Sequence, residues 1–270
     1  MERYLLKNII ILILVLVNGF LLGALILRHS ASSQAQHQVE DQLVALFAAD
    51  GMELSPDVIS KETPPATLSL ARDVERERAA AAFFLGSPVP AGDQSGDTCT
   101  YSTPAGVARF RSNGGFDIVG SLASGEEAKD LCRRFCKAFS WAEPQFSLDK
   151  NGTGTAVAAC FHGKLPVFNC TVTFTFDRGT LLTVSGTLLP ESGTTVSESR
   201  KPLSAAAALT AFQQARRESY MVVSAVTGME TGYALQGSTA SALSLTPMWR
   251  IATDTADYYV NCITGTVSAG

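Results

Sequence analysis

The chain has 270 residues, 46% hydrophobic and 17% charged, enough for one large domain or for two or three small ones. Residues 1–28 hold three basic side chains and one acidic one, so the rest carries 18 basic and 24 acidic groups. The resulting net charge of −6 makes that part a poor candidate for binding nucleic acid or an anionic membrane surface.

Residues 9–27 form an apolar stretch, IIILILVLVNGFLLGALIL, which Asn18 and two glycines interrupt. A helix of this length covers about 28 Å, close to the hydrocarbon thickness of a bilayer. We expect an uncleaved membrane anchor. The alternatives are a cleaved signal peptide, with SAS or SQA after Arg28 as its cleavage site, and a buried core helix. Arg3 and Lys7 favour a cytoplasmic N-terminus and a single pass, with the chain beyond Arg28 outside the membrane.

Beyond the anchor, the spacing of apolar residues switches several times between helical and strand periods. Ser124 with Glu127 fits a capping box at the start of one helix, and the polar stretch 190–202 is typical of a linker. The pattern predicts helices over 30–49, 71–86, 124–141 and 203–219, and strands over 99–120, 155–161, 166–176, 180–189, 222–236, 245–253 and 258–268.

The strand over 166–176 alternates Val172, Phe174 and Phe176 with three threonines. This indicates an antiparallel sheet with one covered face, and the helix over 124–141 is the natural cover. After the linker the same order of helix and strands recurs. We therefore expect an α+β fold, in which a transmembrane helix precedes tandem modules of one helix and an antiparallel sheet.

The expected organisation has four parts. They are the cytoplasmic tip and transmembrane helix over 1–28, an N-terminal extracytoplasmic region over 29–120, a first α+β module over 121–195 and a second over 196–270.

The chain has six cysteines, Cys99, Cys132, Cys136, Cys160, Cys170 and Cys262. Outside a membrane they are either buried free thiols or partly paired in one or two disulfides, whose connectivity cannot be read from sequence. Cys132 and Cys136 are spaced C-x3-C, which is not the C-x-x-C redox spacing, and no second ligand pair supports zinc.

Enzyme chemistry finds little support in the sequence, so we expect no catalytic, cofactor-binding or metal-binding residue. The three histidines are His29, His37 and His162. Cys160 and His162 would face the same side of a strand, which allows a thiol–imidazole nucleophile, although no third orienting group stands out. Asp254 and Asp257 could form a carboxylate pair, but Asp is common in turns because it binds its own backbone there.

Five residues are candidates for binding a partner. Trp249 and Arg250 allow two interpretations: either Trp249 fills the core under the preceding helix, or an exposed Trp–Arg pair anchors a partner protein. In the apolar stretch, Gly19 and Gly23 would let another helix approach closely, and Asn18 could hydrogen-bond to it. Tolerated packing in a lone anchor is the alternative.

Residues 200–270 carry short motifs in a definite order: Val-x-x-Val, Gly-Tyr, Pro-x-Trp-Arg-Ile, Tyr-Val-Asn and Thr-Gly. They occupy Val223, Val226, Gly232, Tyr233, Pro247, Trp249, Arg250, Ile251, Tyr259, Val260, Asn261, Thr264 and Gly265. With the single span, this order resembles the YycI and YycH regulators of Gram-positive bacteria, and YycI most. The final strand-turn-strand is also similar to PepSY modules. The resemblance extends more weakly to 1–50 and 155–190.

The resemblance implies a regulatory protein of the cell membrane. YycI-type proteins lie in the membrane with YycH-type partners and a two-component sensor histidine kinase, whose activity they adjust through contacts of spans and ectodomains. We therefore expect the chain to modulate such a kinase by protein–protein contact, alone or with a YycH-type regulator. The alternative is a PepSY-type module that binds or inhibits an extracytoplasmic protease or cell-wall enzyme.

Overall fold

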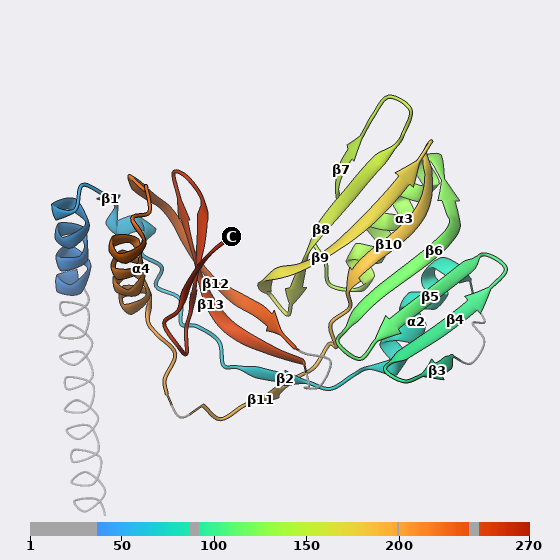
Figure 1. Cartoon of the computed structure of the whole chain (residues 1–270), viewed down its shortest axis with the longest axis horizontal. Coiled ribbons are helices and arrows are strands. Elements are labelled where there is room, and N and C mark those ends of the chain that lie inside the picture. The colour runs from blue at the N-terminus through green and yellow to red at the C-terminus, as the bar shows by residue number, and fades with distance from the viewer. Residues whose placement is uncertain (1–36, 87–91, 199, 238–242) are drawn as a thin grey trace, which may run out of the picture.

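The chain has a mixed α+β fold, as expected from the sequence. The structure, a computed structural model, describes residues 37–86, 92–198, 200–237 and 243–270. In these ranges fifteen strands form one hydrogen-bonded sheet. The sheet is divided between two lobes, and helices cover each part of it (Figure 1).

The expected membrane anchor lies outside the described residues. This holds for the apolar stretch 9–27 and for Asn18, Gly19 and Gly23 within it. In the ranges that the structure describes, no helix has the length and apolar character needed to cross a membrane. The anchor and its contacts therefore stay predictions.

The first lobe is an antiparallel sheet with two helices on one face (Figure 1). The helices are α2 (Val74–Leu85) and α3 (Gly125–Ala138). The spatial order of the strands is β7 (Gln145–Leu148), β8 (Gly154–His162), β9 (Leu165–Asp177), β10 (Thr180–Thr187), β6 (Gly115–Ser124), β5 (Gly106–Arg111), β4 (Thr98–Thr103) and β3 (Asp93–Ser95). The elements predicted here are present, and β7 lies where a loop was expected.

One-sided burial explains why these elements form. On α3, Cys132 and Phe135 belong to a stripe of buried residues at helical spacing, while the opposite side is charged. On β9, Val172, Phe174 and Phe176 are buried and the threonines between them face outward, so the predicted alternation is confirmed. The two apolar surfaces therefore meet and form the first core.

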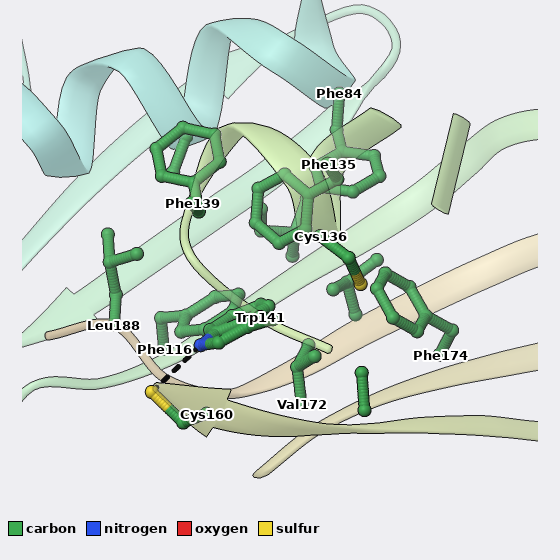
Figure 2. Close-up of a cluster of buried hydrophobic side chains, with 14 of the residues drawn as sticks. Phe84, Phe116, Phe135, Cys136, Phe139, Trp141, Cys160, Val172, Phe174 and Leu188 are labelled. Atoms are coloured by element: carbon green, nitrogen blue, oxygen red, sulfur yellow. Dashed lines mark hydrogen bonds between the residues drawn. The ribbon is translucent and has the colours of Figure 1, made fainter. Parts of the chain in front are cut away.

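Phe135 of α3 lies at the centre of the first core (Figure 2). Its ring centroid is 4.6 Å from that of Phe84, 4.7 Å from that of Phe139 and 5.2 Å from that of Trp141. Trp141 in turn stacks on Phe116 of β6, with 5.9 Å between centroids. Because this aromatic cluster holds α2 and α3 against the same strands, the two helices share one core.

The second lobe has a separate core, built from both ends of the described chain. Its elements are the helix over 37–49, β1 (Glu53–Leu54), a 3-10 turn (Pro56–Val58), α4 (Ala205–Ser219), β12 (Ala225–Gln236), β13 (Leu243–Thr253), β14 (Asp257–Asn261) and β15 (Val267–Ala269). Phe47 from the first helix, Phe212 from α4 and Trp249 from β13 are buried together. Asp50 also accepts a hydrogen bond of 2.8 Å from Nε of Arg217 at the end of α4.

Residues of the N-terminal region expected over 29–120 contribute to the cores of both lobes. Residues 43–59 contribute to the core of the second lobe, whereas 74–120 belong to the first. The reason is the apolar stripe of the helix over 37–49. Together with α4, this helix covers the part of the sheet that belongs to the second lobe. The segment between residues 59 and 74 crosses from the second lobe to the first.

A helix followed by an antiparallel meander occurs three times in the described residues, where the sequence predicted two such units. The units start at α2, α3 and α4. The first two join side by side through β6 and β10 and bury a common core, while the third stands in the second lobe. The boundary predicted between 120 and 121 falls inside β6, and the four-part division stays a prediction.

All six cysteines are free thiols with buried side chains. Burial raises the pKa of Cys132, Cys136 and Cys262 to about 12 in each case. In these three side chains the reactive thiolate is therefore scarce at neutral pH. Of the two alternatives left open by the sequence, the structure has the free thiols.

We predict that a thiol reagent at pH 8 modifies the six cysteines of the native full chain slowly, at a rate set by opening of the fold. In denaturant without reductant, all six should react at once. A colorimetric thiol count before and after adding denaturant measures both. A count of four or two in denaturant would instead establish disulfides.

Candidate binding groove between the lobes

The lobes meet along a narrow junction. β9 and β12 are paired in parallel at a single position, Val167 with Tyr233. Next to it the Asn169 side chain acts like a strand backbone, because its amide donates to the Leu235 carbonyl oxygen at 2.9 Å and accepts from the Leu235 N–H at 2.7 Å. The predicted linker contributes too: β11 (Thr194–Thr195) pairs with β2 (Leu68–Leu70), which pairs with β13.

Close approach at the junction requires a residue without a side chain on β12. A Cβ atom at Gly232 would lie 2.6 Å from the carbonyl oxygen of Pro166 and 2.6 Å from the ring of Phe168. The backbone oxygen cannot move aside without shifting β9. Gly232 therefore sets how closely the lobes pack.

We predict that Gly232→Ala lowers the free energy of unfolding by about 1–3 kcal/mol, the usual cost of overpacking. Thermal unfolding of the full chain in detergent checks this. Gly228→Ala on the same strand is the matched control, since its Cβ would meet one atom, the Ala252 Cβ at 3.6 Å. Equal effects of the two substitutions would contradict a tight junction at Gly232.

A hollow of about 360 Å³ opens beside this junction, which we call the inter-lobe groove. It is lined by Phe168 and Asn169 of β9, Ala234 of β12, Met248 of β13, Tyr259 of β14 and residues 268–270. Phe168 comes from the first lobe and Tyr259 from the second, and their rings lie 5.1 Å apart. Partial burial raises the pKa of Tyr259, so its phenol is neutral at physiological pH. The groove is thus an apolar hollow with an aromatic wall from each lobe.

Charged side chains continue the same face of the second sheet. Glu230, Arg250 and Tyr259 are direct cross-strand partners on β12, β13 and β14. Arg250 donates to Asp257 at 2.9 Å and also pairs with Glu230. Its side chain is 35% exposed. Arg250 is not among the lining residues, but it lies two positions along β13 from Met248 and opposite Tyr259, a place that we call the rim of the groove.

Trp249 faces the other way. It is fully buried, and its indole N–H donates to the Leu203 carbonyl oxygen at 2.8 Å. Alternation along β13 sends Trp249 toward α4 and Arg250 toward the opposite face. The interpretation in which both side chains form an exposed anchor is therefore wrong for Trp249, and the alternative, a core residue under the helix, describes its position.

The thiol and imidazole that were candidates for nucleophilic chemistry have different partners. The Cys160 sulfur accepts the indole N–H of Trp141 at 3.0 Å inside the first core (Figure 2). Alternation along β8 buries Cys160 with Ala156 and Ala158, and the register shift at this point places the extra residues, 168–170, on β9. The His162 ring instead contacts Tyr233 of the second lobe, at 6.2 Å between centroids. No hydrogen bond joins the two side chains in the described structure.

The two aspartates that were candidates for a carboxylate pair bind different partners. Asp254 accepts the backbone N–H groups of Ser224 at 3.0 Å and Ala225 at 3.2 Å, which lowers the pKa of its carboxyl. Asp257 instead accepts a hydrogen bond from the Arg250 guanidinium. His37 contacts Glu40 at 3.2 Å, and His29 lies outside the described residues. In the described part of the chain, no group of three or more His, Cys, Asp or Glu side chains is placed to hold a metal ion.

Sequence reasoning missed Phe168, Met248 and Tyr259 as groove residues. A signal for Tyr259 was present, because two successive tyrosines in a strand point to opposite faces. Tyr258 is buried against Phe212, with 5.1 Å between ring centroids, so Tyr259 points outward. Phe168 and Met248 gave no signal, since the groove exists only where the lobes meet.

Comparison with known proteins finds matches among solved structures, two of which follow. No protein-family model matches the chain, and no curated protein matches it. An uncharacterized protein from Eubacterium rectale ATCC 33656 has a TM-score of 0.45 and 9% identity, over 77% of this chain and 86% of that one. The C-terminal domain of YpeB from Bacillus megaterium has a TM-score of 0.35 and 13% identity, over 74% of this chain and 98% of that one.

Proposed function

We propose that the chain is a membrane-anchored extracytoplasmic regulator, which modulates a two-component sensor histidine kinase through protein–protein contact. The observation that carries this proposal is the inter-lobe groove, with Phe168, Met248 and Tyr259 in its walls and Arg250 at its rim. Aromatic residues, Met and Arg are the types enriched at the centres of protein interfaces. An extracytoplasmic segment of the kinase is the proposed occupant.

The anchor has a part in the same proposal. The stretch 9–27 holds the chain beside the kinase in the cell membrane, with a single pass and the N-terminus in the cytoplasm. In this proposal, Gly19 and Gly23 would let a kinase span or a YycH-type regulator approach closely, and Asn18 would hydrogen-bond to it. Holding both partners in one membrane raises their effective concentration, so a modest groove suffices for stable contact.

A crosslinking pull-down from native membranes tests the proposal. The intact chain is compared with a version whose residues 9–27 are replaced by an unrelated poly-Leu helix, which keeps the anchor and removes its specific contacts. We expect a histidine kinase with the intact chain and less of it with the poly-Leu version. Recovery of a secreted protease or cell-wall enzyme with both versions would favour the inhibitor alternative, and no partner with either would contradict both.

A further inference from the structure

A second hollow, of about 350 Å³, lies on the first lobe and shares no lining residue with the inter-lobe groove. The start of α2, the end of α3, the turn between β8 and β9, and the segment after β10 meet there. Its walls include Phe139, Phe161 and Leu189, and its charged groups are Arg76 and Glu191. We call it the Arg76 pocket.

Arg76 is held in place by the first lobe. Its side chain is 9% exposed, its guanidinium lies 5.2 Å from the centre of the Phe139 ring, and it donates to the Phe139 carbonyl oxygen at 3.1 Å. The buried Nε has no hydrogen-bond partner among the described residues. Its place in the first turn of α2 also sets a positive charge at the positive end of the helix dipole. A fixed, incompletely satisfied guanidinium is a strong site for an anion.

The carboxylate that pairs with Arg76 is weakly held. It belongs to Glu191, whose side chain is 72% exposed, in the segment that leads from the first lobe to the second. An ion pair with one member in solvent contributes little to stability, because water competes for the exposed group. Another carboxylate can therefore take its place on Arg76 without a large loss.

His162 also lines the pocket but is uncharged, so Arg76 carries the positive charge of the pocket. Burial, followed by the nearby charge of Arg76, lowers the pKa of His162, so this imidazole is neutral at pH 7. A neutral imidazole can still donate one N–H. His162 also touches Tyr233 of the second lobe, which places the pocket next to the junction.

We propose that the Arg76 pocket binds a carboxylate-bearing ligand, which displaces Glu191 from the guanidinium. The volume is at the lower end for small-ligand sites and fits a short peptide end or an acidic side chain with its neighbours. Phe139, Phe161 and Leu189 receive the apolar body of such a ligand, while Arg76 takes the carboxylate. Displacement frees the segment around Glu191, so occupancy is coupled to the connection between the lobes. This proposal is independent of the kinase and of the inter-lobe groove.

Calorimetric titration of the full chain in detergent tests the proposal with three probes. The first is the dipeptide acetyl-Ala-Ala with a free carboxylate, the second is its C-terminal amide, and the third is acetyl-Ala-Glu-amide, with the carboxylate on a side chain. We expect one or both acids to bind and the amide to fail. Tighter binding of the first acid assigns the site to peptide C-termini, and tighter binding of the other assigns it to acidic side chains.

Two substitutions make the test independent of folding defects at Arg76. Glu191→Gln removes the tethered competitor from an exposed position, and we expect two- to fivefold tighter binding of the acid probe. Asp117→Asn is the matched control, because it removes the partner of Arg111 in another exposed ion pair and should leave binding unchanged. Equal binding of acid and amide, or no acid binding to either the natural chain or the Glu191→Gln variant, would overturn the proposal.

Discussion

Replacing Trp249 with alanine is expected to lower the free energy of unfolding by about 3–5 kcal/mol, the range for removing a large aromatic side chain from a core. Trp249 is fully buried between β13 and α4, and its N–H satisfies the Leu203 carbonyl oxygen just before α4 begins. The substitution therefore leaves a cavity and an unpaired carbonyl group. Urea denaturation of the full chain, followed by circular dichroism, measures the loss.

The neighbouring residue provides the contrast. Arg250→Ala should change stability by less than about 1 kcal/mol, because its ion pairs with Glu230 and Asp257 are partly exposed. The same substitution should reduce capture of the partner, since Arg250 stands at the rim of the groove. Trp249→Phe keeps a ring and loses the N–H. It should lower the free energy of unfolding by less than Trp249→Ala does and by more than Arg250→Ala does. If Trp249→Ala is as stable as the natural chain, α4 does not pack on this face of β13.

The second large effect is expected from Phe135→Ala, again about 3–5 kcal/mol, in the first core. Phe135 contacts rings of α2, of the segment after α3 and of the sheet, so its loss leaves a void among several elements. The chain has two tryptophans, and each lies in a different core: Trp141 in the first and Trp249 in the second. Their fluorescence can report the two cores separately.

We expect Phe135→Ala to lower the urea midpoint of the Trp141 signal, measured in a Trp249→Phe background. The midpoint of the Trp249 signal, measured in a Trp141→Phe background, should move much less, because that core shares no buried residue with the first. Both backgrounds without Phe135→Ala are the controls. Equal shifts of the two signals would mean that the lobes unfold as one unit.

Much of the fold could be predicted because burial on one side leaves a period in the sequence. The alternation on β9 and the apolar stripe of α3 are examples, and both elements lie where they were expected. β7, β2 and β11 were missed for the opposite reason. They are short, and backbone pairing with a neighbouring strand holds them rather than a stripe of buried side chains.

The placement of distant segments could not be read from the sequence. Asp50 and Arg217 form a hydrogen bond although 167 positions separate them, and nothing local indicates that the helix over 37–49 packs beside α4. The same holds for the groove, whose walls Phe168 and Tyr259 come from different lobes. For Trp249 the sequence left two interpretations, and burial decides between them. An arginine in the first turn of a helix, as at Arg76, was a signal that could have been noticed.

Site-specific photocrosslinking tests most directly whether the inter-lobe groove receives a partner. Tyr259 is replaced by p-benzoylphenylalanine in the full chain, in native membranes, and crosslinked products are identified by mass spectrometry. Tyr220, 90% exposed at the end of α4 and absent from the groove lining, carries the same probe as the matched control. We expect a crosslinked sensor kinase from position 259 and much less from position 220. Equal crosslinking from both positions, or none from position 259, would contradict the proposal.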